Sequence, residues 1–228
     1  GRLYGEELVR AVDSALDEAS GAEKPVFLFI NIADAHHPWS AVPGGLPWMP
    51  AREALDNRPR FPDTPYPRFL RGDLVGEQKR QFLAHVVDSY DYAVWRADRT
   101  FGAVMTLLWH RGVFTGPSRA VVTSDHGELL GEHDLVGHGL FVYEGISRVP
   151  LFYRSKTGEP LPLDEEAPLS ALTAYDLAAE GALPAKPREV RAAGYPDGML
   201  VELFGAERFA SAHAAAWSGA EKITWADR

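Results

Sequence analysis

Three short, mostly apolar runs place the strongest constraint on how this chain can fold. They are "KPVFLFINI" at 24–32, "RAVVTSD" at 119–125 and "RVPLFYR" at 148–154. A strand that is apolar on both faces is typical of a sheet covered by helices on each side. The runs alternate with segments of helical periodicity at 4–19 and 77–111. We therefore predict an α/β fold in which a mainly parallel sheet is flanked by helices.

The remaining segments carry weaker patterns. Positions 40–76 are rich in proline, glycine and arginine, which predicts an irregular surface excursion. Beyond residue 155 we expect a helix near 169–180, a strand near 199–204 and a helix near 206–217. We divide the chain into residues 1–160, part of the α/β domain, and residues 161–228, a small α+β extension that packs on it.

Composition excludes some classes of function. With 228 residues and 46% hydrophobic side chains, the chain can bury a substantial core. A formal net charge of −9 argues against a nucleic-acid partner, since little could neutralise a phosphate backbone. The chain has no cysteine, so it holds no disulfide and no cysteine nucleophile. No stretch reaches the length of a membrane span. Any export signal would precede Gly1, so the compartment stays open.

Metal-binding side chains gather where the strand at 119–125 ends. The stretch "VVTSDHGELLGEHDLVGHG" at 121–139 brings Asp125 and His126 to the end of that strand. A carboxylate oxygen and an imidazole nitrogen together suit calcium, manganese or zinc. Two ligands are too few for a closed site, so others would have to come from elsewhere. The alternative is that Asp125 caps the following segment and His126 is a solvated loop residue.

Three further histidines lie in loops that leave predicted strands at their carboxyl ends. His36 and His37 follow the run at 24–32, and His138 lies between two glycines, where the backbone can approach a ligand closely. In parallel α/β sheets, ligands bind outside these strand ends. Imidazole titrates near neutral pH, so such a side chain could protonate a leaving group or hold an anion. The alternative is a loop histidine bonded to backbone, and Trp39 beside them could wall a pocket or simply pack.

Four stretches of the chain resemble the sulfatases of the alkaline phosphatase superfamily. In chain order they are "FLFINIADAHHPW", "DSYDYAVWRADRTFGAVMTLLWHRGVF", "AVVTSDHGELLGEHDLVGHGLFVYEGISRVPLFYR" and, in a weaker form, "LSALTAYDLAAEGALP". The first three resemble the strand that leads into a His-x-Pro motif, the long helix before the metal strand, and the metal strand with its histidine loop. The resemblance is strong over 24–154 and weak beyond. It implies an alkaline-phosphatase-like fold, of which this chain would hold a part.

The resemblance implies roles for four side chains. Asp125 and His126 would be two ligands of a divalent metal that also binds the anionic oxygens of the ester. His36, the first residue of the His-x-Pro motif, would contact the sulfate and help to protonate the leaving oxygen. His138 would contact the sulfuryl group and the leaving oxygen. Sites of this kind stabilise the charge that develops on the transferred group.

The resemblance also indicates substrate contacts and the identity of the metal. His37 and Trp39 would lie at the mouth of the pocket, and His133 is a third candidate for substrate binding. In this family calcium is usual when an asparagine follows the aspartate. Here His126 takes that place, which favours manganese or zinc over calcium because imidazole suits those ions better.

The chain departs from the family at the nucleophile. In the family a formylglycine, made within a Cys-x-Pro-x-Arg or Ser-x-Pro-x-Arg motif, precedes these segments together with an Asp-Asp metal pair. Neither feature occurs in these 228 residues. We therefore expect the carboxyl-terminal part of a sulfatase catalytic domain. Formylglycine is expected only in the missing amino-terminal part, which would be the partner of this chain, and the chain alone is expected not to turn over substrate.

The predicted function is that of a metallohydrolase acting on small-molecule sulfate esters. One alternative within the superfamily is a phosphoesterase or phosphonate monoester hydrolase, which shares the Asp-His-Gly-Glu stretch and would act on phosphate esters or phosphonates. An alternative from another class is a non-catalytic binding or assembly protein derived from a sulfatase. The two enzymatic readings predict a nucleophile encoded upstream of this chain, and the third predicts none.

Overall fold

The structure is a computed structural model that describes residues 3–44, 46–55, 64–139, 141–156, 161, 167–184, 189–196, 198–204, 209–218 and 221–226. The chain forms two compact units. Unit 1 holds Gly1–Arg58 and Leu74–Phe114, and unit 2 holds Pro59–Asp73 and Thr115–Arg228. This division differs from the predicted boundary at residue 160, which stays a prediction.

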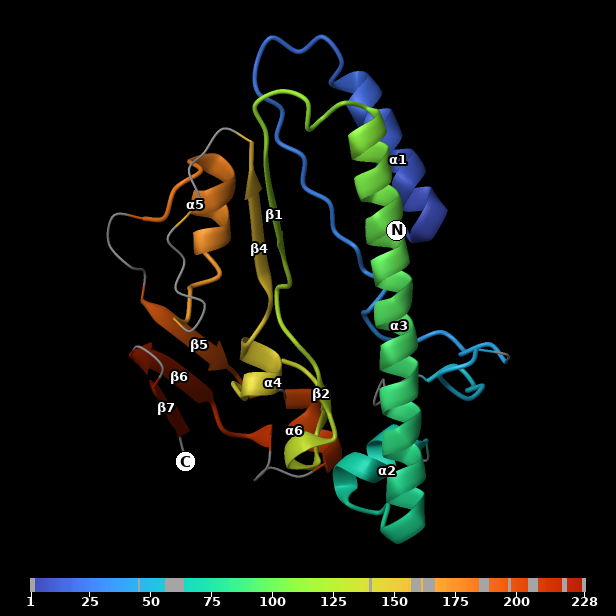
Figure 1. The fold of residues 1–228 in the computed structure, drawn as a ribbon. Helices are drawn as coiled ribbons and strands as arrows, with labels where there is room; N and C mark the ends of the chain where they lie inside the picture. The colour runs from blue at the N-terminus through green and yellow to red at the C-terminus, as the bar shows by residue number, and fades with distance from the viewer. Residues whose placement is uncertain are drawn as a thin grey trace. The chain divides into compact units, whose positions relative to one another are not determined.

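Two helices form the framework of unit 1 (Figure 1). α1 spans Gly5–Glu18 and α3 spans Gly76–His110, so both helices predicted for this part of the sequence are present. α1 buries Leu8 and Val12, which are spaced four apart and therefore lie on one face of the helix. That apolar face explains why α1 packs along α3.

The loop that follows in unit 1 is held by backbone pairing and by α3. Trp39 pairs with Leu55, and Val42 pairs with Arg52, as two antiparallel bridges. The side chains of Trp39, Val42 and Leu55 are buried. Nε of Arg52 donates a hydrogen bond of 2.7 Å to Oδ2 of Asp88 on α3. This part of the predicted irregular excursion therefore has a fixed course.

The apolar segment at 24–32, predicted as a buried strand, is not a strand in this structure. Phe27 is 76% exposed and Phe29 is 78% exposed. None of the sheets formed by the described residues includes the segment. A strand forms only where a neighbour supplies the ladder hydrogen bonds. An apolar run therefore favours a strand, but the strand forms only if a neighbouring strand pairs with it.

The first sheet of unit 2 pairs β1, Arg119–Thr123, with β4, Leu151–Ser155, in antiparallel register. Both segments were predicted as strands. Helix α5, Thr173–Ala179, lies against β1 and buries Leu177 completely (Figure 1). The helix predicted near 169–180 is thus present, in a shorter form.

A short ribbon follows β1 and carries most of the histidine-rich loop. β2, Leu129–Leu130, pairs in antiparallel register with β3, Val136–Gly137. The 3-10 turn η1, Glu132–Asp134, joins the two strands, and the four-residue helix α4, Glu144–Ser147, comes after β3. Since β2 directly follows the segment that leaves β1, the ribbon folds the loop back on itself.

Helix α2, Pro65–Arg71, belongs to unit 2 and anchors this ribbon. Proline at its first position and Gly72 in the left-handed conformation at its end are the usual signals for a short helix. The hydroxyl of Tyr66 donates a hydrogen bond of 3.2 Å to the carbonyl of Val136 on β3. The contact is buried, so it fixes the ribbon to a helix that is distant in sequence.

The carboxyl-terminal part of unit 2 contains β5, Val190–Gly194, α6, Gly198–Phe204, β6, His213–Ser218, and β7, Glu221–Ala226. The three strands form one antiparallel sheet with β6 in the middle. Two predictions were wrong here. The strand predicted at 199–204 is a helix, because methionine, leucine and glutamate favour helix. The segment predicted as a helix at 206–217 runs into strand β6 instead. Pairing with a strand on each side outweighs the helix propensity of its alanines. Residues 205–208 lie outside the described residues.

The sheets formed by the described residues are all antiparallel. The mainly parallel sheet and the alkaline-phosphatase-like fold stay predictions. Among the described helices, none combines the length and the apolar composition that crossing a membrane requires.

Candidate functional site

The loop that leaves β1 in unit 2 brings a carboxylate and an imidazole together. Asp125 is exposed, with 86% of its side chain accessible, and its Oδ2 lies 3.5 Å from Nε2 of His126. Its other oxygen, Oδ1, accepts a hydrogen bond of 3.1 Å from the backbone N–H of His126. This contact is with the next residue, whereas a capping carboxylate accepts from an N–H two or three residues further on. The capping alternative therefore stays a hypothesis, and Oδ2 faces the imidazole.

The ring of His126 is oriented by its own backbone. Nδ1 lies 2.8 Å from the carbonyl oxygen of Gly127. Because a carbonyl oxygen only accepts, Nδ1 carries the hydrogen, and in the neutral ring the lone pair is then on Nε2. A histidine that binds a metal through one nitrogen is commonly held in this way through the other. The nitrogen that faces Asp125 is therefore the one suited to a metal.

Gly127 allows this loop to pass against α4. A Cβ atom at this position would lie 2.1 Å from the carbonyl oxygen of Gly145. The backbone N–H of Gly127 donates a hydrogen bond of 2.7 Å to the carbonyl of Ile146. The close approach of two backbones explains why the loop has glycine here, and it fixes where Asp125 and His126 lie.

His138 is bonded to a buried acid. Its Nδ1 lies 3.0 Å from Oε2 of Glu128, whose side chain is only 5% exposed. The ring also stacks on that of His126, with centroids 4.0 Å apart. The pKa of His138 is raised above its usual value, first by the hydrogen bond to Glu128 and also by the charges of Glu128 and Asp125, against the opposing effect of burial. Unit 2 therefore unites the predicted residues Asp125, His126 and His138, and adds Glu128.

His133 makes a ring contact with Tyr143. It is in the turn η1 with a left-handed backbone, φ 57°, and its ring stacks on Tyr143 at a centroid distance of 3.7 Å. The two rings are nearly parallel, with an interplanar angle of 13°. Its predicted role in substrate binding stays a prediction.

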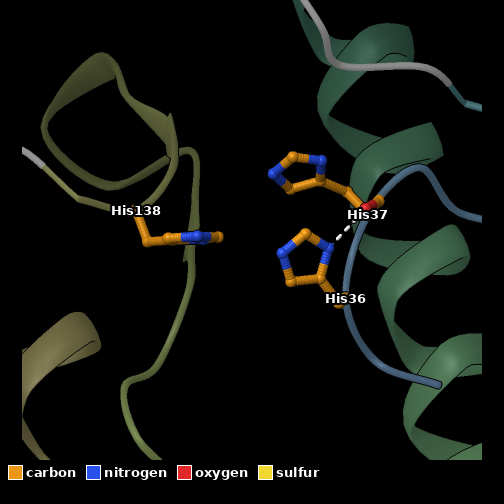
Figure 2. A group of neighbouring side chains, drawn as sticks. All are labelled: His36, His37 and His138. Carbon is orange, nitrogen blue, oxygen red and sulfur yellow. Dashed lines mark hydrogen bonds between the residues drawn. The ribbon is translucent and has the colours of Figure 1, made fainter. Parts of the chain in front are cut away.

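The predicted residues of unit 1 lie in one loop. Figure 2 shows His36 and His37, joined by a hydrogen bond between Nδ1 of His36 and the carbonyl of His37. Their ring centroids are 4.6 Å apart. Trp39 is 2% exposed, and its Nε1 donates a hydrogen bond of 3.0 Å to the carbonyl of Ala35. The rings of Trp39 and Tyr90 also form an edge-to-face pair, with centroids 5.7 Å apart. The indole of Trp39 is thus packed in the interior of unit 1.

Sequence reasoning missed the buried ion pair behind this loop. The side chain of Asp34 is 1% exposed, and its Oδ1 lies 3.2 Å from Nη2 of Arg96 on α3. Neither carboxylate oxygen accepts a hydrogen bond of good geometry within the described residues. Nη1 of Arg96 donates to Oγ of Ser40 at 2.8 Å. An acid directly after an apolar run was the available signal for a buried charge.

The packing of Trp39 leads to a testable expectation. A Trp39→Phe variant should lower the free energy of unfolding by about 1–3 kcal/mol, because it removes one hydrogen bond and leaves a cavity. Trp48→Phe is the matched control, since Trp48 is 53% exposed and its replacement should cost less than about 0.5 kcal/mol. Urea unfolding followed by circular dichroism measures both. Equal effects of the two substitutions would contradict the structural role of Trp39.

Comparison with known proteins gives a local match. A stretch of 44 residues is 46% identical to the uncharacterized sulfatase YidJ of Escherichia coli (strain K12). It covers 19% of this chain and 9% of that protein, so the match spans a small part of both. No protein-family model matches the chain, and no solved structure matches it. The chain is therefore related to a sulfatase-named protein over a short segment.

Proposed function

We propose that the protein carrying this chain is a sulfatase-type metallohydrolase that cleaves small sulfate esters. The observation that carries the proposal is the continuous run of contacts from Asp125 through His126 and His138 to Glu128. This run offers a carboxylate and an imidazole for a metal, next to an imidazole for proton transfer. The local identity to a sulfatase-named protein agrees with it. The alkaline-phosphatase-like fold with a parallel sheet is part of the same proposal.

Asp125 and His126 would hold a divalent metal. The donor set fits, because an exposed carboxylate oxygen faces the imidazole nitrogen that carries the lone pair. Such an ion, when bound, neutralises negative charge on the oxygens of an anionic ester. An oxygen and a nitrogen donor suit manganese or zinc better than calcium. Two donors make an incomplete site, so further ligands would come from other parts of the protein.

His138 is the proposed proton donor to the leaving oxygen. Its Nδ1 is engaged with Glu128, so a proton would pass to the substrate through Nε2. As the bond between sulfur and the leaving oxygen breaks, Nε2–H gives its proton to that oxygen, and the alcohol departs neutral. The ring is left neutral, with its remaining hydrogen on Nδ1.

The other roles rest on the resemblance. His36 would contact the sulfate and share in protonating the leaving oxygen, and His37 and His133 would contact the substrate. Trp39, which is buried and bonded to the carbonyl of Ala35, would support the loop that carries His36 and His37. The nucleophile is proposed to be a formylglycine outside these 228 residues, where Cys-x-Pro-x-Arg or Ser-x-Pro-x-Arg would supply it. This chain by itself is therefore proposed to lack turnover.

The test is hydrolysis by the full reading frame that contains this chain. Sulfatase activity predicts release of 4-nitrophenol from 4-nitrophenyl sulfate, at a higher kcat/KM than from the corresponding phosphate or phenylphosphonate. Asp125→Asn should abolish it, because a metal ligand loses its charge. Asp91→Asn, which changes an exposed carboxylate on α3, is the control and should retain full activity.

Each other outcome selects a different function. Preferred hydrolysis of the phosphate or the phosphonate would establish the superfamily alternative. Hydrolysis of none of the three, by a protein that folds, would favour the non-catalytic alternative. Removal of metal by a chelator should stop sulfate hydrolysis, and manganese or zinc should restore it better than calcium.

A further inference from the structure

Glu128 and His138 are placed opposite each other by the ribbon that carries them. Leu129 of β2 is paired with Gly137 of β3, so the next residues outward along the same register are Glu128 and His138. Residues opposite each other in an antiparallel pair have side chains on the same face and close together. The ribbon therefore brings the carboxylate to the imidazole by backbone hydrogen bonding, independently of any ligand.

The burial of the Glu128 carboxylate is unfavourable for the stability of the fold. Its side chain is 95% removed from solvent, since 5% is exposed. Oε2 bonds to His138, whereas Oε1 is buried and has no hydrogen-bond partner among the described residues. A buried carboxylate without its full set of partners costs stability. An apolar residue of similar size at position 128 would avoid that cost, so stability alone does not explain a glutamate there.

The imidazole of His138 is held from a second side. Its ring stacks on His126, with an angle of 29° between the planes. His126 is itself oriented by its hydrogen bond to the carbonyl of Gly127. The carboxylate fixes which ring nitrogen is engaged, and the stacked ring fixes the plane. Together these contacts determine the direction in which Nε2 points.

We infer that Glu128 is a positioning residue for the proposed hydrolysis, acting through His138. It holds Nδ1–H of the imidazole in a charge-assisted hydrogen bond, so that Nε2 is the nitrogen that transfers the proton to the leaving oxygen. The inference rests on the proposed function for its chemistry. The contact itself is independent of catalysis.

The experiment compares Glu128→Gln with the wild type in the full reading frame, labelled with ¹⁵N-histidine. In the wild type, the Nδ1–H proton of His138 should resonate far downfield, as expected for a hydrogen bond to a carboxylate. Glu128→Gln should move it upfield. With 4-nitrophenyl sulfate, kcat should fall by about 10–100-fold while KM changes little.

Two further variants keep the experiment decisive. Glu132→Gln changes an exposed glutamate of the same loop and should leave the resonance and kcat unchanged. Glu128→Asp keeps the charge but moves it away from His138 by one methylene, so it should lower kcat as well. This variant replaces Glu128→Gln in the test if the glutamine variant fails to fold. Retention of wild-type kcat by a folded Glu128 variant in an active protein would overturn the inference. A wild type without sulfate hydrolysis would instead overturn the proposed function, whatever the resonance shows.

Discussion

Replacing Gly127 by alanine is expected to lower the free energy of unfolding by about 3 kcal/mol, at the upper end of the cost of overpacking. The added Cβ would lie 2.1 Å from the carbonyl oxygen of Gly145. The obstacle is backbone of α4, which cannot turn aside as a flexible side chain would. The hydrogen bond from Gly127 to Ile146 would lengthen or break at the same time.

The matched control is Gly116→Ala in the same unit, where an added Cβ meets nothing within 4 Å. Its free energy of unfolding should change by less than about 0.5 kcal/mol. Urea unfolding followed by far-ultraviolet circular dichroism measures both variants. A Gly127→Ala protein as stable as the control would show that the loop does not pass this close to α4.

A second large effect is expected in unit 1 from Arg96→Leu. The buried carboxyl group of Asp34 would lose its cation, which should lower the free energy of unfolding by about 3 kcal/mol. Arg80→Leu is the control on the same helix, because the side chain of Arg80 is 75% exposed, and its pair with Glu77 should be worth less than about 1 kcal/mol.

A double variant separates the ion pair from packing. Arg96→Leu combined with Asp34→Leu removes both charges, so it should be more stable than Arg96→Leu alone. Ser40→Ala measures how much of the loss in free energy of unfolding comes from the hydrogen bond between Arg96 and the serine hydroxyl. If the double variant were no more stable than Arg96→Leu, the unpaired carboxylate would not be the cause of the loss.

Local pattern was sufficient for some elements and failed for others. The apolar periodicity that predicted α3 is sustained over ten turns, so no competing structure fits it. The failures at 24–32 and β6 share a cause, whereas the failure at 199–204 came from underrating the helix propensity of its residues. Whether a short apolar run is a strand depends on a neighbour that the run does not encode. β6 has neighbours on both sides, and the segment at 24–32 has none among the described sheets.

The residues of the candidate site that follow a strand directly could be predicted from the sequence. Asp125, His126 and His138 could be named because metal-binding residue types after a strand are a local signal. Glu128 could not be given its contact with His138, since the two are ten positions apart and meet through the register of β2 and β3. Asp34 was missed for the same reason, because its cation lies on α3, far along the chain.

The two exposed phenylalanines of segment 24–32 have a consequence for anyone who produces this chain. Phe27 and Phe29 lie within an apolar run that also contains valine, leucine and isoleucine, and no described strand covers the edges of this run. Such a run attracts identical copies of itself, and stacked copies grow into insoluble aggregates. At the concentrations that spectroscopy needs, we expect the solubility of the chain to be the limit rather than its folding. A lysine placed within the run should oppose this aggregation.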